Sequence, residues 1–335
     1  METQQQQTEF IRRPADREEW LRARSGYVGG SEAAIVLGLS PWKSRVDLYL
    51  LKSGRTTQED EPTEAMRLGN YLEQYAADRY AEKTGRTVRN YGYMVTRGHA
   101  LADVDRLVVP DGEKVASFRE EIRAAGILEC KTARDEWDGE VPLHYQVQAQ
   151  TYMELLDQPW VDFSVVFKSS SRHICPADAP WLRLYRDRAV GARILDEIEA
   201  FWRSVAQDVP PEARTLADAK ALFPNARIDT TKEADARVLH DVAELVRIEA
   251  DRKGLEEEAD AIKGRIAAYM GEADVLVGNG AKLATFRQPK PRRTTDWKAV
   301  AADLARTEEP AHVRAVEAAH TAETPSARRF LLCAK

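Results

Sequence analysis

Cysteine is scarce in this 335-residue sequence, which contains only three. Cys130, Cys175 and Cys333 lie far apart along the chain. Three scattered thiols make neither a paired disulfide framework nor a four-cysteine metal cluster, so a disulfide-stapled fold and an iron-sulfur enzyme are both excluded. The pattern is typical of a protein that works in a reducing cytoplasm.

Long hydrophobic runs are also missing. No stretch of about 18 apolar residues occurs, which predicts that the chain has no transmembrane helix. The first ten residues form a polar, glutamine-rich segment without the apolar core of a signal peptide, so we expect no export. The sequence contains no G-x-x-x-x-G-K-[ST] phosphate loop either, which excludes a built-in ATP-driven motor of that type.

An excess of positive charge is absent as well. Lysine and arginine total 49 against 55 aspartate and glutamate residues, which gives a formal net charge of −6. This charge repels nucleic acid at long range. Any contact with DNA therefore requires a local basic surface.

The residues that are present predict a globular protein in two parts. Hydrophobic residues make up 43% of the chain and charged residues 31%, as in ordinary folded domains. Short helices and strands mix up to a helix at about 195–205, which Pro210 and Pro211 follow. We expect a flexible N-terminus at residues 1–14, a domain of class α/β at 15–212, and a helical C-terminal region at 213–335.

The C-terminal region shows a different pattern. Apolar residues recur every three or four positions from about 233 to 270, which predicts one long helix. Two short apolar segments flank Gly278-Asn279-Gly280 and predict a β-hairpin. A basic link with Lys290, Arg292 and Arg293 then leads to a helical stretch from about residue 296. Such links are usually solvated, although this one could bind DNA through its three basic residues.

The segment from Gly126 to Thr132 is the most informative one for chemistry. Its apolar residues predict a buried strand, in which alternate side chains point to the same face. Glu129 and Lys131 then lie side by side, and burying such a pair costs desolvation energy. The ordinary interpretation is a salt bridge on an edge strand. A functional site is the other interpretation.

A second carboxylate upstream favours the functional interpretation. Asp105 begins an apolar, strand-like run at residues 105–109, and a hairpin would bring it beside Glu129. Asp103 competes for the same role, since in an extended segment it shares a face with Asp105. Two carboxylates supply the oxygen ligands that Mg²⁺ prefers, and Lys131 could orient a water and stabilise a phosphoryl transition state.

Two helices offer further polar residues. Glu73 lies in a predicted helix that runs to about Lys83 and ends at Gly85, and Gly69 one turn earlier would allow close approach of another backbone or of DNA. Gln148 lies in a second predicted helix, at 145–153, with glutamines at three alternate positions. Because these three cannot share one face, at least one should point inward.

Six separated segments, in this order, resemble the YqaJ-type viral recombinase family, relatives of phage lambda exonuclease. They are Arg24 to Glu32, Leu39 to Ser44, Gly69 to Glu73, Asp105, Glu129 to Ala133 and Tyr145 to Gln148. The resemblance covers roughly residues 15–210. It implies a restriction-endonuclease-like core of the PD-(D/E)xK class, a mixed sheet flanked by helices.

The resemblance also implies roles for individual residues. Asp105, Glu129 and the main-chain carbonyl of Cys130 match metal ligands for Mg²⁺ or Mn²⁺, in a centre expected to hold two ions. Glu73 matches the helix glutamate that helps to hold metal, and Lys131 and Gln148 match the catalytic lysine and a supporting glutamine. For the 5′-phosphate of a DNA end, the matching residues are Arg24, Ser31 and, with less support, Asp103.

Two positions depart from the family pattern. Arg106 follows Asp105 where many relatives of lambda exonuclease have glycine, which could restrict the turn after the aspartate. Asp103 stands where a small or polar residue that contacts phosphate is expected, which could alter 5′-phosphate recognition.

The function implied by the resemblance is an ATP-independent exonuclease. It would resect linear double-stranded DNA from 5′ ends and leave a 3′ strand for a phage single-strand annealing protein. The implied assembly is a ring-shaped homotrimer, and the implied location is the bacterial host cytoplasm, as a phage or prophage protein. The alternatives are an endonuclease or single-strand nuclease with the same core, or a catalytically silent DNA-binding or assembly protein.

Overall fold

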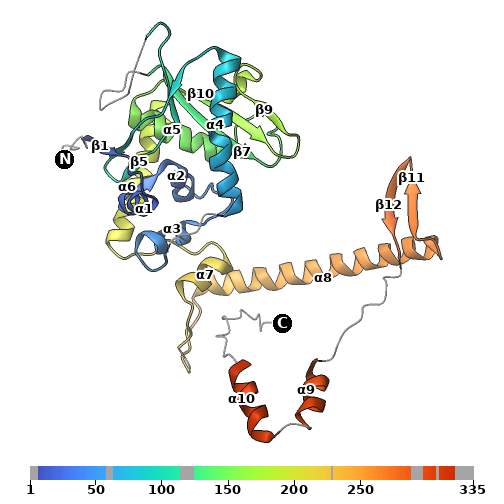
Figure 1. Ribbon diagram of the computed structural model, residues 1–335. Coiled ribbons are helices and arrows are strands. Elements are labelled where there is room, and N and C mark those ends of the chain that lie inside the picture. The colour runs from blue at the N-terminus through green and yellow to red at the C-terminus, as the bar shows by residue number, and fades with distance from the viewer. Residues whose placement is uncertain are drawn as a thin grey trace. The chain divides into compact units, whose positions relative to one another are not determined.

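The computed structural model describes residues 7–57, 63–113, 124–227, 229–287, 297–306 and 309–320. The chain divides into two compact units, Met1–Phe223 and Pro224–Lys335, which are described separately. Figure 1 shows their elements. Lys290, Arg292, Arg293 and Cys333 lie outside the described residues.

The first unit contains a six-stranded mixed sheet. Its order is β10-β8-β7-β6-β3, and β9 pairs with β8 as well. The central strands β7 and β8 run parallel, whereas β6 runs antiparallel to β7. The bounds are β3 Val88–Arg89, β6 Arg106–Val108, β7 Gly126–Ala133, β8 Trp160–Phe167, β9 Arg172–Ile174 and β10 Arg183–Tyr185.

A smaller four-stranded sheet lies in the same unit, in the order β1-β4-β5-β2. Its strands are β1 Thr8–Arg12, β2 Val28–Gly29, β4 Tyr93–Arg97 and β5 Ala100–Ala102. The pairing of β1 with β4 ties the start of the unit to residues more than eighty positions later, with Thr8 opposite Arg97. The segment from residue 7 is therefore part of the fold.

Helices accompany both sheets. They are α1 Arg17–Ser25, α2 Gly30–Val36, α3 Arg45–Lys52, α4 Glu64–Thr84, α5 Leu143–Leu156, α6 Arg188–Ala206 and α7 Leu216–Leu222, with a short 3-10 helix η1 at Pro180–Leu182. Their ends have local causes. Thr63 caps α4, and Gly85, at a φ of 69°, ends it.

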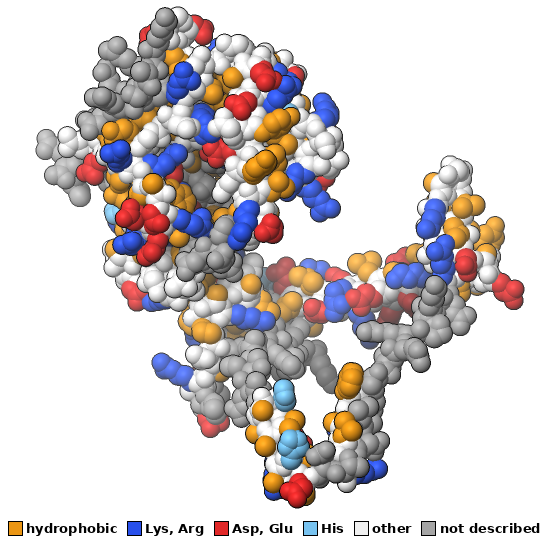
Figure 2. Space-filling view, viewed as in Figure 1, with side chains coloured by type: hydrophobic (Ala, Val, Ile, Leu, Met, Phe, Trp, Pro, Cys, Tyr) orange, Lys and Arg blue, Asp and Glu red, His pale blue; other side chains and the backbone are white. Residues whose placement is uncertain are grey.

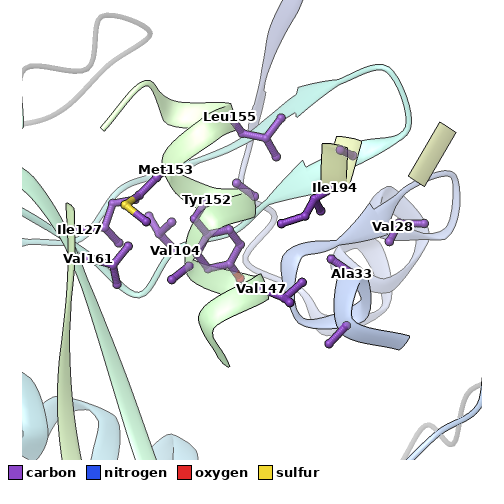
Figure 3. Packing of buried hydrophobic residues seen from close by; sticks show 14 of the residues in the cluster. Val28, Ala33, Val104, Ile127, Val147, Tyr152, Met153, Leu155, Val161 and Ile194 are labelled. Atoms are coloured by element: carbon purple, nitrogen blue, oxygen red, sulfur yellow. The ribbon is translucent and has the colours of Figure 1, made fainter. Parts of the chain in front are cut away.

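The main core lies around α5. Figure 3 shows Met153 of this helix beside Ile127 of β7 and Val161 of β8, and Val147 near Ala33 of α2. All five residues are buried. Helix α5 therefore links the central sheet to the N-terminal helices, and its position fixes whatever site lies between them.

The second unit is mostly helical. Helix α8 runs over Ala236–Met270, and β11 Val275–Gly278 and β12 Ala281–Thr285 form a hairpin around Asn279 and Gly280, both at positive φ. Helices α9 Trp297–Ala305 and α10 Pro310–His320 follow. Many apolar side chains of α8 are exposed, and Figure 2 shows basic, acidic and hydrophobic side chains along its visible face.

The expected fold class is confirmed: the protein is α/β, with a mixed sheet, flanking helices and a C-terminal helical region that carries a hairpin. No helix among the described residues is long and apolar enough to cross a membrane. The boundary after residue 212 stays a prediction; the first compact unit continues through α7 to Phe223.

Candidate active site

Asp105 lies directly before β6, and β6 pairs antiparallel with β7. The register places Arg106 opposite Leu128, so Asp105 falls opposite Glu129. The backbone N–H of Cys130 donates a hydrogen bond of 2.8 Å to Asp105 Oδ2. Strand pairing therefore brings together two carboxylates that are 24 residues apart in sequence.

Glu129 and Lys131 lie on the same face of β7, as strand alternation predicts. Lys131 Nζ lies 2.8 Å from Glu129 Oε2, and the two side chains are only 15% and 1% exposed. Gln148 Nε2, on α5, donates a longer hydrogen bond of 3.3 Å to the same oxygen. The other oxygen, Glu129 Oε1, is buried and has no hydrogen-bond partner among the described residues.

The acidic pair carries a strong electrostatic penalty. Burial, followed by the charge of Glu129, raises the pKa of Asp105 to about 8. Burial also raises the pKa of Glu129, although Lys131 opposes this shift. For Lys131, burial lowers the pKa, but Glu129 and Asp105 outweigh it, and the pKa lies above its ordinary value. One ammonium thus faces the buried carboxylate of Glu129 and the half-buried carboxylate of Asp105, a charge balance that favours an additional cation.

Glu73 approaches this pair from α4. Its Oε1 accepts a hydrogen bond of 2.5 Å from Arg106 Nη1. The same Nη1 atom donates to the main-chain oxygen of Asp105 at 2.7 Å, so Glu73 lies near Asp105. The negative charge of Glu73 also contributes to the raised pKa of both Asp105 and Glu129. The side chain of Glu73 is one-third exposed, so it lies at the rim of the acidic centre.

The residues present fit a divalent cation. Glu129 Oε1 is an unpartnered buried acceptor among the described residues, and Asp105 offers a second, half-buried carboxylate. Oxygen donors of this kind suit Mg²⁺, which binds through one or two carboxylates and keeps several waters. Burial, followed by Asp105, raises the pKa of the Cys130 thiol, so this side chain is uncharged and a poor ligand. No group of three or more His, Cys, Asp or Glu side chains among the described residues has the arrangement of a complete metal site.

Gln148 connects the acidic centre, through Tyr152, to Asp103. Its Nε2 also contacts the hydroxyl of Tyr152 at 3.1 Å, and this hydroxyl donates to the main-chain oxygen of Asp103 at 3.1 Å. Gln148 is buried, as expected for one of the three glutamines on this helix. Tyr152 was not predicted, although its position four residues after Gln148 places both on one face of α5.

The residues expected at a 5′-phosphate are only partly brought together. Arg24 Nη1 lies 3.9 Å from Asp103 Oδ2, and the Arg24 guanidinium lies 4.3 Å from the centre of the Trp20 ring. Asp103 is held by an ion pair with Arg13 and by a hydrogen bond of 2.8 Å from Trp20 Nε1. Ser31 lies on an exposed position of α2.

Asp103 and Asp105 have different partners, although an extended segment would place them on one face. Residues 103 and 104 belong to no regular strand, so strict alternation does not hold between β5 and β6. Arg13 and Trp20 were missed as partners of Asp103, since no local pattern predicts a contact across more than eighty residues. At Gly69 no other element of the described chain approaches closely: apart from the backbone of α4 itself, no described heavy atom lies within 4 Å of a Cβ built there. Close approach of DNA at this glycine stays a prediction.

Comparison with known proteins supports the resemblance. Residues 19–156 match the YqaJ-like viral recombinase domain, and this range contains every residue proposed above for the site. An uncharacterised protein, YqaJ of Bacillus subtilis (strain 168), is 36% identical over 148 residues, which is 42% of this chain and 42% of the relative. The match thus spans less than half the length of that relative.

Solved structures of exonucleases are among the similar folds. An alkaline exonuclease (LHK-Exo) from Laribacter hongkongensis is 26% identical, with 57% of this chain and 94% of that chain covered and a TM-score of 0.45. A phage-related exonuclease from Haemophilus somnus 129PT is 14% identical, with 55% and 95% covered and a TM-score of 0.40. The resemblance inferred from the sequence motifs is confirmed for residues 19–156 by the family match.

Proposed function

We propose, from the premise that residues 19–156 form a YqaJ-like viral recombinase domain, that this chain is a metal-dependent DNA nuclease. The observation that carries the proposal is the group of Asp105, Glu129 and Lys131, in which Glu129 is buried and its Oε1 has no hydrogen-bond partner among the described residues. In an ion pair that only stabilises a fold, the buried polar atoms have hydrogen-bond partners. A buried carboxylate oxygen left open beside a second carboxylate is better explained as a cation ligand.

The chemistry is the hydrolysis of a phosphodiester. Mg²⁺ or Mn²⁺ bound by Asp105, Glu129 and the main-chain carbonyl of Cys130, with Glu73 nearby, would lower the pKa of a water and withdraw charge from the phosphate. Two ions are proposed. The residues of this chain supply the remaining functions.

Lys131 is proposed as the catalytic cation. Its ammonium is largely shielded from solvent, remains protonated because its pKa is raised, and lies 2.8 Å from Glu129. It can therefore orient the attacking water and stabilise negative charge on the phosphate in the transition state. Gln148 would hold Glu129 in place through its hydrogen bond to Oε2.

We further propose that the substrate is the end of linear double-stranded DNA. The enzyme would resect the 5′-ended strand without ATP and leave a 3′ strand for a single-strand annealing protein, within a ring-shaped homotrimer in a bacterial host. Arg24, with Ser31, would bind the 5′-phosphate. Asp103 would not bind it directly, because its carboxylate already engages Arg13 and Trp20 and would repel an anion.

Lysine replacement tests the proposed chemistry. Lys131→Ala should reduce cleavage of linear duplex by at least about a hundredfold, because it removes a preorganised charge at the transition state. Binding of the same DNA should change little. Lys220→Ala, at an exposed position on α7, is the matched control and should cleave normally. Cleavage by Lys131→Ala at the wild-type rate would refute the active site.

Defined DNA substrates test end specificity separately. Linear duplexes with 5′-phosphate, 5′-hydroxyl or blocked ends are digested with Mg²⁺ or Mn²⁺, and closed circular DNA is the control. An exonuclease degrades the phosphorylated linear duplex fastest and leaves the circle intact. Cutting of the circle would support the endonuclease alternative, and binding without cleavage would support a silent DNA-binding protein.

A further inference from the structure

Arg106 is the one basic side chain of β6, and the structure gives it a specific set of partners. The residue is only 8% exposed. Its Nη1 donates to Glu73 Oε1 at 2.5 Å and to the main-chain oxygen of Asp105 at 2.7 Å, and its Nη2 donates to Gln74 Oε1 at 3.1 Å. A single guanidinium therefore joins the strand of the acidic centre to helix α4.

The sequence indicated only that an arginine after Asp105 could restrict the local turn, and this stays a prediction. The side chain also extends across to another element and bonds the candidate metal-centre glutamate. Glu73 would otherwise approach the carboxylates of Asp105 and Glu129 with no compensating charge. The planar fork of arginine can satisfy several acceptors in one fixed geometry, which lysine cannot do.

We propose that Arg106 is a positioning residue that holds Glu73 beside Asp105 and Glu129, so that the α4 carboxylate is in place before a cation binds. This role rests on the proposed metal centre. Arg106 contacts no reacting atom in it; its effect passes through Glu73. If Arg106 only joined β6 to α4, its replacement would lower the free energy of unfolding and leave the affinity for the cation unchanged.

A double-mutant cycle on Mn²⁺ binding separates these two roles. Isothermal titration calorimetry on the full chain without DNA gives Kd for wild type, Glu73→Gln, Arg106→Lys and the double variant. Arg106→Lys keeps the positive charge and loses the fork, so it isolates geometry from charge. Partners behind metal ligands typically change metal affinity by about 10- to 100-fold.

The proposal predicts that both single variants weaken Mn²⁺ binding by about tenfold or more, and that the double variant is no weaker than Glu73→Gln. The proposal is overturned if Arg106→Lys binds Mn²⁺ as tightly as wild type does. It is also overturned if the Kd of the double variant rises by the product of the two single-variant factors. A wild-type chain that binds no Mn²⁺ would overturn the metal centre itself, and this role with it. Each protein's thermal unfolding transition is recorded to show that it is folded.

Gln74→Ala gives a milder test if Arg106→Lys does not fold. It removes one of the three acceptors of Arg106 while Glu73 and the arginine remain. The proposal predicts weaker Mn²⁺ binding by a smaller factor than in Arg106→Lys. If Gln74→Ala binds Mn²⁺ as tightly as wild type while Glu73→Gln binds it more weakly, Glu73 needs no support from this network.

A separate observation concerns Trp42, in the loop between α2 and α3. Its side chain is 70% exposed. Its ring packs edge-on against His144, with 4.7 Å between ring centres, and His144 lies 4.1 Å from the ring of Tyr145. Lys131 Nζ lies 5.1 Å from the centre of the Tyr145 ring. A row of aromatic rings therefore leads from the proposed catalytic lysine to an exposed indole.

Other aromatic side chains of the unit are exposed too, including Tyr71 and Tyr185. Trp42 is distinguished by this link to Lys131 and by its place on the wall of an open cavity of about 710 Å³. Lys43, Arg45 and Arg214 line this cavity beside Trp42, together with the acidic Asp47, Glu212 and Asp218. The Nε of Arg45 is buried and has no hydrogen-bond partner among the described residues. An aromatic platform next to basic side chains is the usual composition of a single-strand binding surface.

We infer that Trp42 stacks on an unpaired nucleobase of the DNA strand close to the site of cleavage. Stacking is indifferent to base identity, since every base offers an aromatic face. It would hold a strand after separation from its complement. This inference rests on the proposed nuclease function.

Binding of single strands in a Lys131→Ala background tests the inference without cleavage. Fluorescence anisotropy with a dye-labelled oligonucleotide should show that Trp42→Ala weakens binding by about fivefold to tenfold, whereas Trp42→Phe retains most of it. Tyr185→Ala, at an exposed position on β10, is the matched control. With an oligonucleotide of abasic sites, Trp42→Ala and its parent should bind equally.

Two results would overturn the stacking role. One is equal binding of ordinary single strands by Trp42→Ala and its parent; the other is an equal loss on the abasic oligonucleotide. If wild type cleaves DNA while Trp42→Ala behaves as its parent, only the stacking role fails. If wild type cleaves no DNA, the proposed function fails independently of this comparison.

Discussion

At the scale of single residues, the site combines charges that are unfavourable in isolation. Glu129 is buried beside the half-buried Asp105, and the nearest compensating groups are Lys131 and, through Glu73, Arg106. Burial of like charges raises a pKa because the charged forms lose solvation and repel each other. Such an arrangement stores free energy that a bound cation can release, which is why perturbed groups of this kind cluster at functional sites.

His173, on β9, provides a pH-dependent property outside the site. Ser164 Oγ donates to the main-chain oxygen of Ala76 at 2.7 Å, so the 2.7 Å contact between Ser164 and His173 must use an Nε2–H donor. The Nδ1 atom is then a buried acceptor, without a partner among the described residues. Burial, and next the charge of Lys83, lowers the pKa of His173 to about 4.

The sign of the stability effect follows from this lowered pKa. Between pH 6.5 and about 4 the unfolded chain binds a proton that the folded chain does not, so the free energy of unfolding falls as the pH drops through this window. We expect a loss of about 1 kcal/mol between pH 7.5 and pH 5, after allowance for solvent screening. Urea unfolding of wild type and His173→Gln measures it. The same pH dependence in both proteins would contradict the assignment.

The site residues differ in how far sequence could predict them. Glu129 and Lys131 follow from strand alternation, and Asp105 from a hairpin between neighbouring strands. The contacts of Arg106 with Glu73 and of Asp103 with Arg13 join segments 33 and 90 positions apart. These contacts form only when α4 and β1 pack in the fold, so no local sequence pattern predicts them.

At the scale of elements, α5 is the part on which the site depends. It carries Gln148 and Tyr152, and it packs on β5, β8, α2 and α6. Strand β7 and helices α4 and α5 were all predicted, because each has strong local periodicity or clear capping residues. The four-stranded sheet was not predicted, because β1 and β2 are short and their partners lie far along the chain.

Gly30, at the start of α2, should tolerate no side chain. A Cβ at this position would lie 2.3 Å from Cε1 of Tyr152, whose hydroxyl contacts Gln148. Gly30→Ala should lower the free energy of unfolding by about 1–3 kcal/mol through overpacking, and should slow DNA cleavage by displacing Tyr152. Urea unfolding and cleavage of linear duplex measure the two effects.

Gly69 provides the matched control, because it is also a helical glycine. Apart from the backbone of α4 itself, no described heavy atom lies within 4 Å of a Cβ built there. Gly69→Ala should therefore stabilise α4 by about 0.5–1 kcal/mol, through better helix propensity. Equal stability of the Gly30→Ala and Gly69→Ala proteins would show that the contact between α2 and α5 is looser than described.

At the scale of the whole molecule, the core lies almost entirely in one unit. Among the described residues, every buried hydrophobic residue except Met270 precedes Phe223. The second unit exposes most apolar side chains of α8, so its described part has little core of its own. Sequence periodicity predicted this long helix correctly, but it could not show how little of the helix would be buried.

Truncation tests whether Phe223 or residue 212 ends the folding unit. A chain of residues 1–223 retains α7, where Asp218 is 4% exposed and accepts hydrogen bonds of 3.0 Å from the N–H groups of Arg214 and Thr215. Leu222 packs against the main core. The fragment 1–223 should therefore unfold cooperatively, at a midpoint within a few degrees of the full chain's main transition.

A fragment of residues 1–212 loses α7 and these contacts, which exposes the α3 surface on which α7 packs. We expect its free energy of unfolding to be about 1–3 kcal/mol lower than that of 1–223, the range for lost packing and capping. Thermal and urea unfolding of both fragments measure the difference. Equal stability would place the end of the folding unit before α7, whereas failure of 1–223 to fold would show that the core needs the C-terminal unit.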